Sequence, residues 1–187
     1  MHGEVHIKNV KISIYLHLRP DIIDKIRDFS ITEQKLKKTA SFVIFRDINF
    51  IYTIFFSGHI NCTRIKHPRL IPNATERILS KLRLLESDLK NVVTDSILAV
   101  AKISNYICMV SFAKYLKQNN FNVQFNPQRF PGICVRKPGG CILTFVSGKV
   151  VFTGFKSEEK ICSAKNSLIQ TYNAYTHLFT QNRVPNC

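Results

Sequence analysis

The sequence predicts an α+β fold in which two pseudo-symmetric repeats form one antiparallel sheet with helices on one face. The stretch "FFSGHINCTR", which begins at Phe55, matches "FVSGKVVFTG", which begins at Phe145, at an offset of 90 residues. Farther upstream, "IKNV" at Ile7 echoes "LKNV" at Leu89 at an offset of 82 residues. Two copies of this length are too few and too long for a solenoid, so a pseudo-twofold domain is expected.

One domain is expected over residues 1–187. It consists of repeat one at 5–86, repeat two at 87–180 and a tail at 181–187. A chain of 187 residues with 45% apolar content lies within the usual size of one domain and can bury a core.

Repeat one begins with a strand, because apolar residues from Val10 to Leu18 alternate with polar ones. Pro20 suits the first turn of a short helix that follows. The segments "SFVIFR", "FIYTIFF" and "HINCT" predict three strands, the last two joined by a tight hairpin at Ser57-Gly58. A long helix then opens at Asn73, with Glu76 completing a capping box.

Repeat two has the same predicted order. The segment "LKNVVTDSILAV" is a strand, "SFAKYLKQN" a helix, and "GICVR", "CILTFV" and "KVVFT" are strands before a last helix capped by Ser157. The four long helices are expected to cover one face of the joined sheet. The uncovered face is therefore where function is expected.

The charge of the chain points to a polyanionic partner. Lys and Arg total 27 against 12 Asp and Glu, a formal charge of +15. A generally basic surface without a specific ligand is the alternative, which the placement of the charges must decide. No apolar run is long enough to span a membrane, and the N-terminus lacks the apolar core of a signal peptide, so an intracellular protein without a membrane partner is expected.

The sequence carries no signature of catalysis or metal binding. Its six cysteines include no CxxC pair, and no His has zinc-ligand spacing. No Ser-His-Asp, phosphate-loop or paired-carboxylate pattern is present in the sequence. We therefore expect no enzyme activity, no cofactor, no catalytic residues and no metal ligands.

The uncovered face is predicted to be apolar at its middle and basic at its edges, which suits an opened DNA minor groove. Amide and hydroxyl donors from Asn9, Asn91, Thr63 and Thr153 could read the acceptors on A·T pairs. Phe130 and Phe145, at the ends of neighbouring strands, could act as a wedge between two base pairs.

The chain resembles the TATA-binding protein family in "FPG" with the arginine after it, in "TFVSGKVVFTG" and in the two "KNV" strands. The resemblance follows the order of elements along nearly the whole chain and is dense from about Phe125 to Glu159. It implies a saddle-shaped ten-stranded sheet that binds and bends TATA-like DNA, with phenylalanine pairs that kink the duplex at either end. The DNA-contacting residues that it implies, together with those predicted above, are Asn9, Arg46, Phe55, Thr63, Lys66, Asn91, Val93, Phe130, Pro131, Arg136, Leu143, Phe145, Lys149, Val151, Thr153 and Lys156.

Repeat one departs from the family pattern. The first phenylalanine falls on Ala40, the two valines on Lys11 and Asn61, and the hairpin lysine on His59, so that Phe55 is the only wedge expected there. Asp95, a carboxylate on the predicted DNA face, counts against tight, symmetric TATA binding.

Residues on the partner side depart as well. The acidic residues that precede "FPG" in the family, and that meet a general transcription factor, are Gln128 and Arg129 here, which favours an altered partner. Such divergence is typical of a specialised or viral relative.

The predicted function is a transcription initiation factor that binds and bends AT-rich duplex DNA through the minor groove and helps to assemble a preinitiation complex. The expected partners are AT-rich DNA, general transcription factors and RNA polymerase, with altered or viral partners allowed. The expected location is the nucleus, or a viral transcription site. The alternative is an interaction subunit of a transcription complex, with the same fold and little DNA binding of its own.

Overall fold

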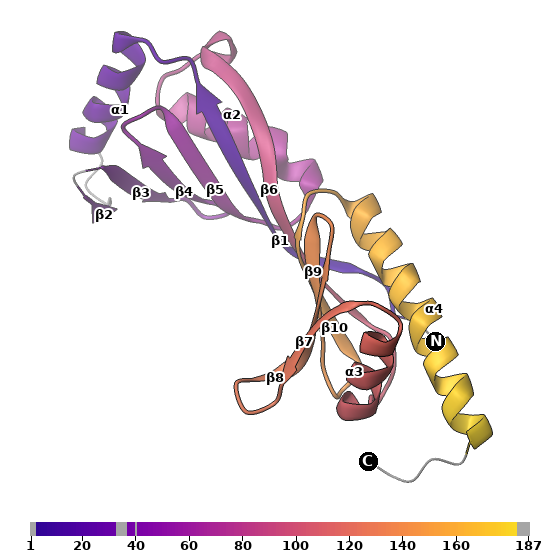
Figure 1. The fold of residues 1–187 in the computed structure, drawn as a ribbon. Coiled ribbons are helices and arrows are strands. Elements are labelled where there is room, and N and C mark those ends of the chain that lie inside the picture. The colour runs from indigo at the N-terminus through magenta and orange to yellow at the C-terminus, as the bar shows by residue number, and fades with distance from the viewer. Residues whose placement is uncertain (1–2, 33–36, 40, 183–187) are drawn as a thin grey trace. The chain divides into compact units, whose positions relative to one another are not determined.

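The computed structural model describes residues 3–32, 37–39 and 41–182, which form two compact units. Unit 1 comprises Met1–Ile7 with Ile97–Cys187, and unit 2 comprises Lys8–Ser96. Strands β1 (His6–Leu16) and β6 (Leu89–Lys102) each contribute residues to both units (Figure 1). Each of these two strands is therefore divided between the units.

Unit 2 contains a sheet with strand order β2-β3-β4-β5-β1-β6, of which β6 contributes its first part. Its helices are α1 and α2, and α2 packs against β5. The bounds are α1 (Pro20–Thr32), β2 (Lys37–Lys38), β3 (Phe42–Arg46), β4 (Ile51–Phe55), β5 (His59–Ile65), a 3-10 helix (Pro68–Leu70), α2 (Ile71–Lys81) and a second 3-10 helix (Glu86–Asp88).

Unit 1 contains the strand order β6-β10-β9-β8-β7, with the last part of β6. Helix α3 packs against β7 and β8, and α4 packs against β10. The bounds are α3 (Met109–Gln118), β7 (Asn122–Asn126), β8 (Phe130–Lys137), β9 (Gly140–Thr144), β10 (Lys149–Phe155) and α4 (Glu158–Asn182).

The predicted order of strand, helix, three strands and helix is present in both halves, and the structure adds the short strands β2 and β7. Two local predictions were wrong. The first strand ends at Leu16, and Leu18 beyond it is 67% exposed. Helix α2 begins at Ile71 without a side-chain cap, because Pro72 lies in its first turn and the preceding turn is closed by His67, whose Nδ1 accepts from the Arg69 N–H at 3.2 Å.

Alternation along the strands places the core on the helix-covered side of each sheet. In unit 2, Val10, Ile12 and Ile14 of β1 are fully buried, as are Ile22 and Ile26 of α1. In unit 1, Val150 and Phe152 of β10 are fully buried together with Ile161 of α4. Because strand residues alternate between faces, the neighbours of these positions line the opposite side of the sheet.

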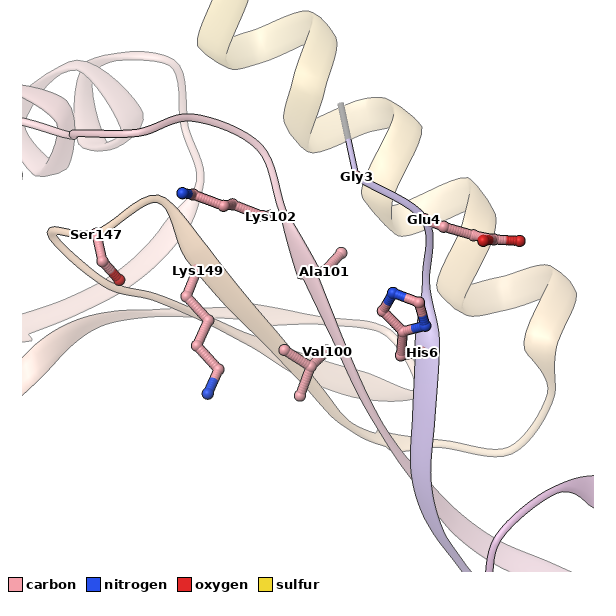
Figure 2. A pocket seen from close by; sticks show the side chains of 8 residues that line it. All are labelled: Gly3, Glu4, His6, Val100, Ala101, Lys102, Ser147 and Lys149. Carbon is pink, nitrogen blue, oxygen red and sulfur yellow. The ribbon is translucent and has the colours of Figure 1, made fainter. Parts of the chain in front are cut away.

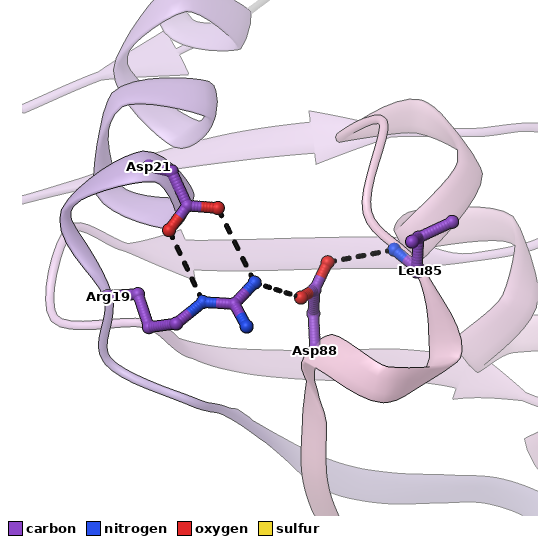
Figure 3. A network of polar contacts seen from close by, with 4 residues as sticks. All are labelled: Arg19, Asp21, Leu85 and Asp88. Carbon is purple, nitrogen blue, oxygen red and sulfur yellow. Dashed lines mark hydrogen bonds and ion pairs between the residues drawn. The ribbon is translucent and has the colours of Figure 1, made fainter.

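A carboxylate anchors the turn that leads into β6. Asp88 is 2% exposed, and its Oδ2 accepts a hydrogen bond from the Leu85 N–H at 2.9 Å, while its Oδ1 accepts one from the Arg19 guanidinium (Figure 3). Arg19 also contacts Asp21 in the first turn of α1. The bond from Leu85, followed by the charge of Arg19, lowers the pKa of Asp88 from its ordinary value. The ionised carboxylate thus joins the start of α1 to the start of β6.

Candidate nucleic-acid interface

The helix-free side of unit 1, here the open face of unit 1, combines an apolar centre with basic positions. Strand pairing places Val151 beside both Leu143 and Val100, and Lys149 beside Lys102. The open face of unit 1 comprises Leu98, Val100, Lys102, Cys134, Arg136, Cys141, Leu143, Phe145, Lys149, Val151 and Thr153, with Phe130 at the end of β8. All of them are half-buried or exposed.

Two thiols lie within this face. Cys134 Sγ and Cys141 Sγ are 3.1 Å apart on neighbouring strands, beside Leu143 and Arg136. Burial raises the pKa of the Cys141 thiol to about 12. That thiol is therefore uncharged at neutral pH, and it keeps the centre of the face apolar.

Phe130 and Phe145 form a ring pair at the end of this face. Their centroids are 5.8 Å apart with a tilt of 68°, and Phe130 is 39% exposed. Gly132 makes room for the pair, because a Cβ on it would lie 2.6 Å from Phe130 Cε1 and 3.1 Å from Phe145 Cε1. The two predicted wedge residues are thus in contact.

A second ring pair, which the sequence analysis missed, lies in unit 2. Phe42 is paired with Phe55 across β3 and β4, and their centroids are 5.5 Å apart. At the offset of 90 residues, Phe42 corresponds to Gly132, where any side chain would fall on the ring of Phe130. Phe42 thus supplies, from two residues later, the ring that Ala40 lacks. The sequence does indicate this second ring. At the offset of 90 residues, "FPG" of repeat two aligns with "ASF" of repeat one, so the aromatic residue is first in one copy and last in the other.

Ala40 itself lies outside the described residues. The ring row of unit 2 continues beyond Phe55 to His59, stacked at 5.3 Å, and on to Tyr15, stacked at 4.8 Å. Four rings therefore cross the end of the helix-free side of unit 2.

The helix-free side of unit 2, here the open face of unit 2, is polar at its centre. It comprises Lys11, Ser13, Tyr15, Phe42, Ile44, Arg46, Ile51, Thr53, Phe55, His59, Asn61 and Thr63. Asp95 of β6 joins it: Ser13 Oγ lies 2.8 Å from Asp95 Oδ2 and 3.1 Å from Asn61 Oδ1. Lys11 Nζ is 3.5 Å from the same carboxylate oxygen.

Both units bend their sheet at a bulge in the matching place. In unit 2 the bulge holds Arg64 at φ 67°, and in unit 1 it holds Gly154 at φ 82°. Asn9 Oδ1 accepts from the Arg64 N–H at 2.8 Å. Because a backbone N–H needs an acceptor, this bond fixes the orientation of the Asn9 amide and leaves its Nδ2 hydrogens as donors for a ligand.

The strand registers revise the match between β1 and β6. Val10 pairs with Ile65 and Ile97 pairs with Phe155, and Ile65 and Phe155 are 90 residues apart. The first strands therefore correspond at an offset of 87 residues, not 82, and Asn9 corresponds to Ser96. The hydrogen-bond register sets the offset of 87 residues between β1 and β6, whereas the repeated "KNV" gives an offset of 82. Asn91, which is exposed, remains a predicted DNA contact without that symmetry.

The remaining predicted residues lie at strand ends and edges. Arg46, Arg136, Lys66, Lys156 and Pro131 are exposed, and Val93, Leu143, Val151, Thr63 and Thr153 are half-buried. Thr153 is paired with Cys141, and Thr63 with Ile51. The structure thus makes the basic side chains accessible to an anion, and it places the two threonines on the open faces of their units.

One hollow of unit 1 gathers basic groups at the edge of its open face. It has a volume of about 390 Å³ and is lined by Gly3, Glu4, His6, Val100, Ala101, Lys102, Ser147 and Lys149. Figure 2 shows Lys149 and Val100 on neighbouring strands, with Lys102 farther along β6. The two lysines are Cα partners, so two positively charged side chains leave neighbouring strand positions at this edge, which favours an anionic ligand.

Among residues 3–32, 37–39 and 41–182, no group of three His, Cys, Asp or Glu side chains is placed to hold a metal ion. Within the same part of the chain, no helix is long and apolar enough to cross a membrane.

Comparison with known proteins gives a family match over residues 96–173, to the family described as "Transcription factor TFIID (or TATA-binding protein, TBP)". The TATA-box-binding protein 3 of Methanosarcina acetivorans is 31% identical over 171 residues, which cover 85% of this chain and 89% of that protein. The TATA-box-binding protein of Thermoplasma acidophilum is 32% identical over 113 residues, a match that spans 58% of this chain and 60% of the relative's own length.

Among solved structures, the Methanococcus jannaschii TBP has a TM-score of 0.77 at 22% identity, and the match covers 91% of this chain and 99% of that one. At this identity the likeness concerns the fold. The predicted fold class, with two repeated halves and one antiparallel sheet, is confirmed by this match.

Proposed function

Because this chain belongs to the TATA-box-binding protein family, we propose that it is a transcription initiation factor that binds AT-rich duplex DNA through the minor groove and bends it. The observation that carries the proposal is the ring pair at one end of each open face, Phe130 with Phe145 and Phe42 with Phe55. These rings are half-buried or exposed on the helix-free side of the sheet, and apolar rings in that position suit insertion between base pairs.

Affinity comes from charge. The exposed basic residues at the strand ends, with the Lys102 and Lys149 pair, can neutralise phosphates and release their counterions. The net charge of +15 favours encounter with any nucleic acid. Sequence preference must therefore come from the centre of the faces.

Selectivity for A·T pairs comes from the open face of unit 1. A·T pairs present only acceptors in the minor groove, together with apolar surface that Leu143, Val151 and Val100 can cover. The hydroxyl of Thr153 on this face is a short donor for those acceptors, and the Nδ2 hydrogens of Asn9, which belongs to unit 2, are further donors.

Bending comes from the rings. Wedges unstack a base step at a cost of about a few kcal/mol, which the added wrapped contacts offset, and the TATA-binding protein is itself the standard example of this mechanism. The rings of each pair lie less than 6 Å apart, so each pair can enter one step as a unit.

The remaining functional predictions belong to the same proposal. The protein helps to assemble a preinitiation complex with general transcription factors and RNA polymerase, and Gln128 and Arg129, both exposed, give the surface before Phe130 a changed charge for its partner. The family is described as a transcription factor, in keeping with a chain that performs no catalysis. The protein acts where its promoter DNA lies, in the nucleus or at a viral transcription site.

A second candidate function is an interaction subunit with little DNA binding of its own. The ion pair between Lys11 and Asp95 favours it, because a carboxylate within the predicted DNA face repels phosphate and the lysine beside it is already paired.

The test is end-to-end energy transfer on a short duplex labelled at both ends, with an AT-rich duplex and a GC-rich one. Wild type, Phe130→Ala/Phe145→Ala and the control Leu178→Ala are compared, because Leu178 is 47% exposed on α4, away from the open face. Transfer should rise on the AT-rich duplex for wild type and the control, and be lost in the double variant. No rise for wild type at modest salt would favour the interaction subunit.

A further inference from the structure

The two open faces differ in polarity at matched positions. At the offsets set by strand pairing, 87 residues for β1 with β6 and 90 for the other strands, apolar residues of unit 1 correspond to polar residues of unit 2. The four matched pairs are Leu98 with Lys11, Val100 with Ser13, Leu143 with Thr53 and Val151 with Asn61. A shared fold thus presents two chemically different surfaces.

The polar positions of unit 2 are joined to one another. The Ser13 O–H donates to Asp95 Oδ2 at 2.8 Å, and Asn61 Oδ1 lies 3.1 Å from the same hydroxyl oxygen. Lys11 balances the carboxylate at 3.5 Å. An ionised carboxylate accepts hydrogen bonds and donates none. The Asp95 side chain is 28% exposed, so it has acceptor positions that remain open to a ligand.

An acceptor at this position has a specific counterpart in DNA. In the minor groove, A·T and T·A pairs show only acceptors, and a G·C pair adds one donor, the guanine N2 amine. A carboxylate facing an A·T pair meets acceptors and gains no bond, whereas facing guanine it accepts a charge-assisted hydrogen bond. In unit 1, Leu143 and Val151 would instead remove water from the guanine amine and offer no acceptor in place of the lost hydrogen bond.

We propose that unit 2 accepts a G·C pair through Asp95 and Asn61, so that the preferred DNA site is asymmetric, with A·T pairs under unit 1 and at least one G·C pair under unit 2. The proposal rests on the proposed function and assigns the sequence preference of the same face. It also gives the two units different targets, which fixes the direction in which the protein lies on the DNA.

The experiment compares duplexes that share one all-A·T half. The other half is A·T throughout, or carries one G·C pair, or carries one inosine·C pair, because the base of inosine differs from guanine only in lacking the 2-amino group. We expect wild type to bind the G·C duplex about tenfold more tightly than the inosine·C duplex. Equal binding, or tighter binding to inosine·C, would overturn the proposal.

A matched variant separates the carboxylate from the rest of the face. Asp95→Ala should bind the inosine·C duplex at least as well as the G·C one. Because the substitution removes a carboxylate that repels phosphate and releases Lys11, the variant should bind the all-A·T duplex at least as tightly as wild type does, and this binding serves as the test of folding. If Asp95→Ala fails to fold, Asn61→Val, which copies Val151, should lower the G·C preference in the same direction. A folded variant that keeps the wild-type preference for the G·C duplex would show that Asp95 and Asn61 do not recognise the G·C pair.

The outcomes also separate this inference from the proposed function. If wild type neither binds nor bends any of the three duplexes, the proposed function fails. If it bends the all-A·T duplex but binds the G·C duplex no more tightly than the inosine·C duplex, the proposed function stands and the asymmetric site is wrong.

Discussion

Phe42 is the residue whose substitution tests most directly how unit 2 contributes to bending. The ring pair of unit 2 has nearly the centroid separation of the pair in unit 1, 5.5 Å against 5.8 Å. If each pair opens one base step, each supplies about half of the bend, so Phe42→Ala should reduce the bend by about half. Non-specific affinity should change little, because the substitution removes no charge.

The assay is end-to-end energy transfer at saturating protein, with affinity measured in parallel. The control exchanges the two positions: Ala40→Phe/Phe42→Gly gives repeat one the arrangement that Phe130 and Gly132 have in repeat two. This double variant should bend DNA as wild type does. A Phe42→Ala protein that bends the duplex fully would refute the assignment of Phe42 as a wedge.

Three further predictions follow from charge, backbone conformation and titration. Lys149→Ala should lower the slope of log affinity against log salt by about one, and an unchanged slope would mean that Lys149 meets no phosphate. Gly148→Ala should lower the free energy of unfolding, measured in urea, by more than about 1 kcal/mol, because Gly148 has φ +71° and a Cβ there would lie 1.9 Å from Ser104 O. An unchanged midpoint of urea unfolding would contradict that packing. Asp88→Asn should be less stable than wild type at neutral pH. Because the pKa of Asp88 is lowered in the folded protein, the stability difference between wild type and variant should be full above about pH 4 and should vanish as pH falls through that folded pKa. A stability difference that does not depend on pH would show that the charge of Asp88 does not cause it.

Repeated residues made the fold largely predictable. The offset of 90 residues in the hairpin strands is reproduced by the strand pairing, because the Ser-Gly turns fix the register on either side. Pro20 and Ser157 marked helix starts that the structure also has, with Ser157 Oγ accepting from the Lys160 N–H at 3.4 Å. Alternation alone identified the buried side of β1.

The candidate site was predictable only where sequence and register agree. The repeated "KNV" matches Asn9 with Asn91 by sequence identity alone. The hydrogen-bonded pairing of β6 with β10 instead makes Ser96 the counterpart of Asn9. Phe42 has no aromatic counterpart at the offset of 90 residues, where it corresponds to Gly132, because a ring can fill the same space from two residues away. The network of Ser13, Asn61 and Asp95 joins residues 48 and 82 positions apart, and no local pattern reveals such contacts.

The strands shared between the units limit how this protein could have diverged. A cut at residue 96 would divide β6, and removing the first seven residues would take part of β1 from unit 1. Neither unit can therefore be removed as a module without cutting a strand of the other. Change is then tolerated on the open face, as at Lys11 and Asn61, while Val10, Ile12 and Ile60 behind it stay buried and apolar. A unit that must be kept for its buried core can still change the chemistry of its open face.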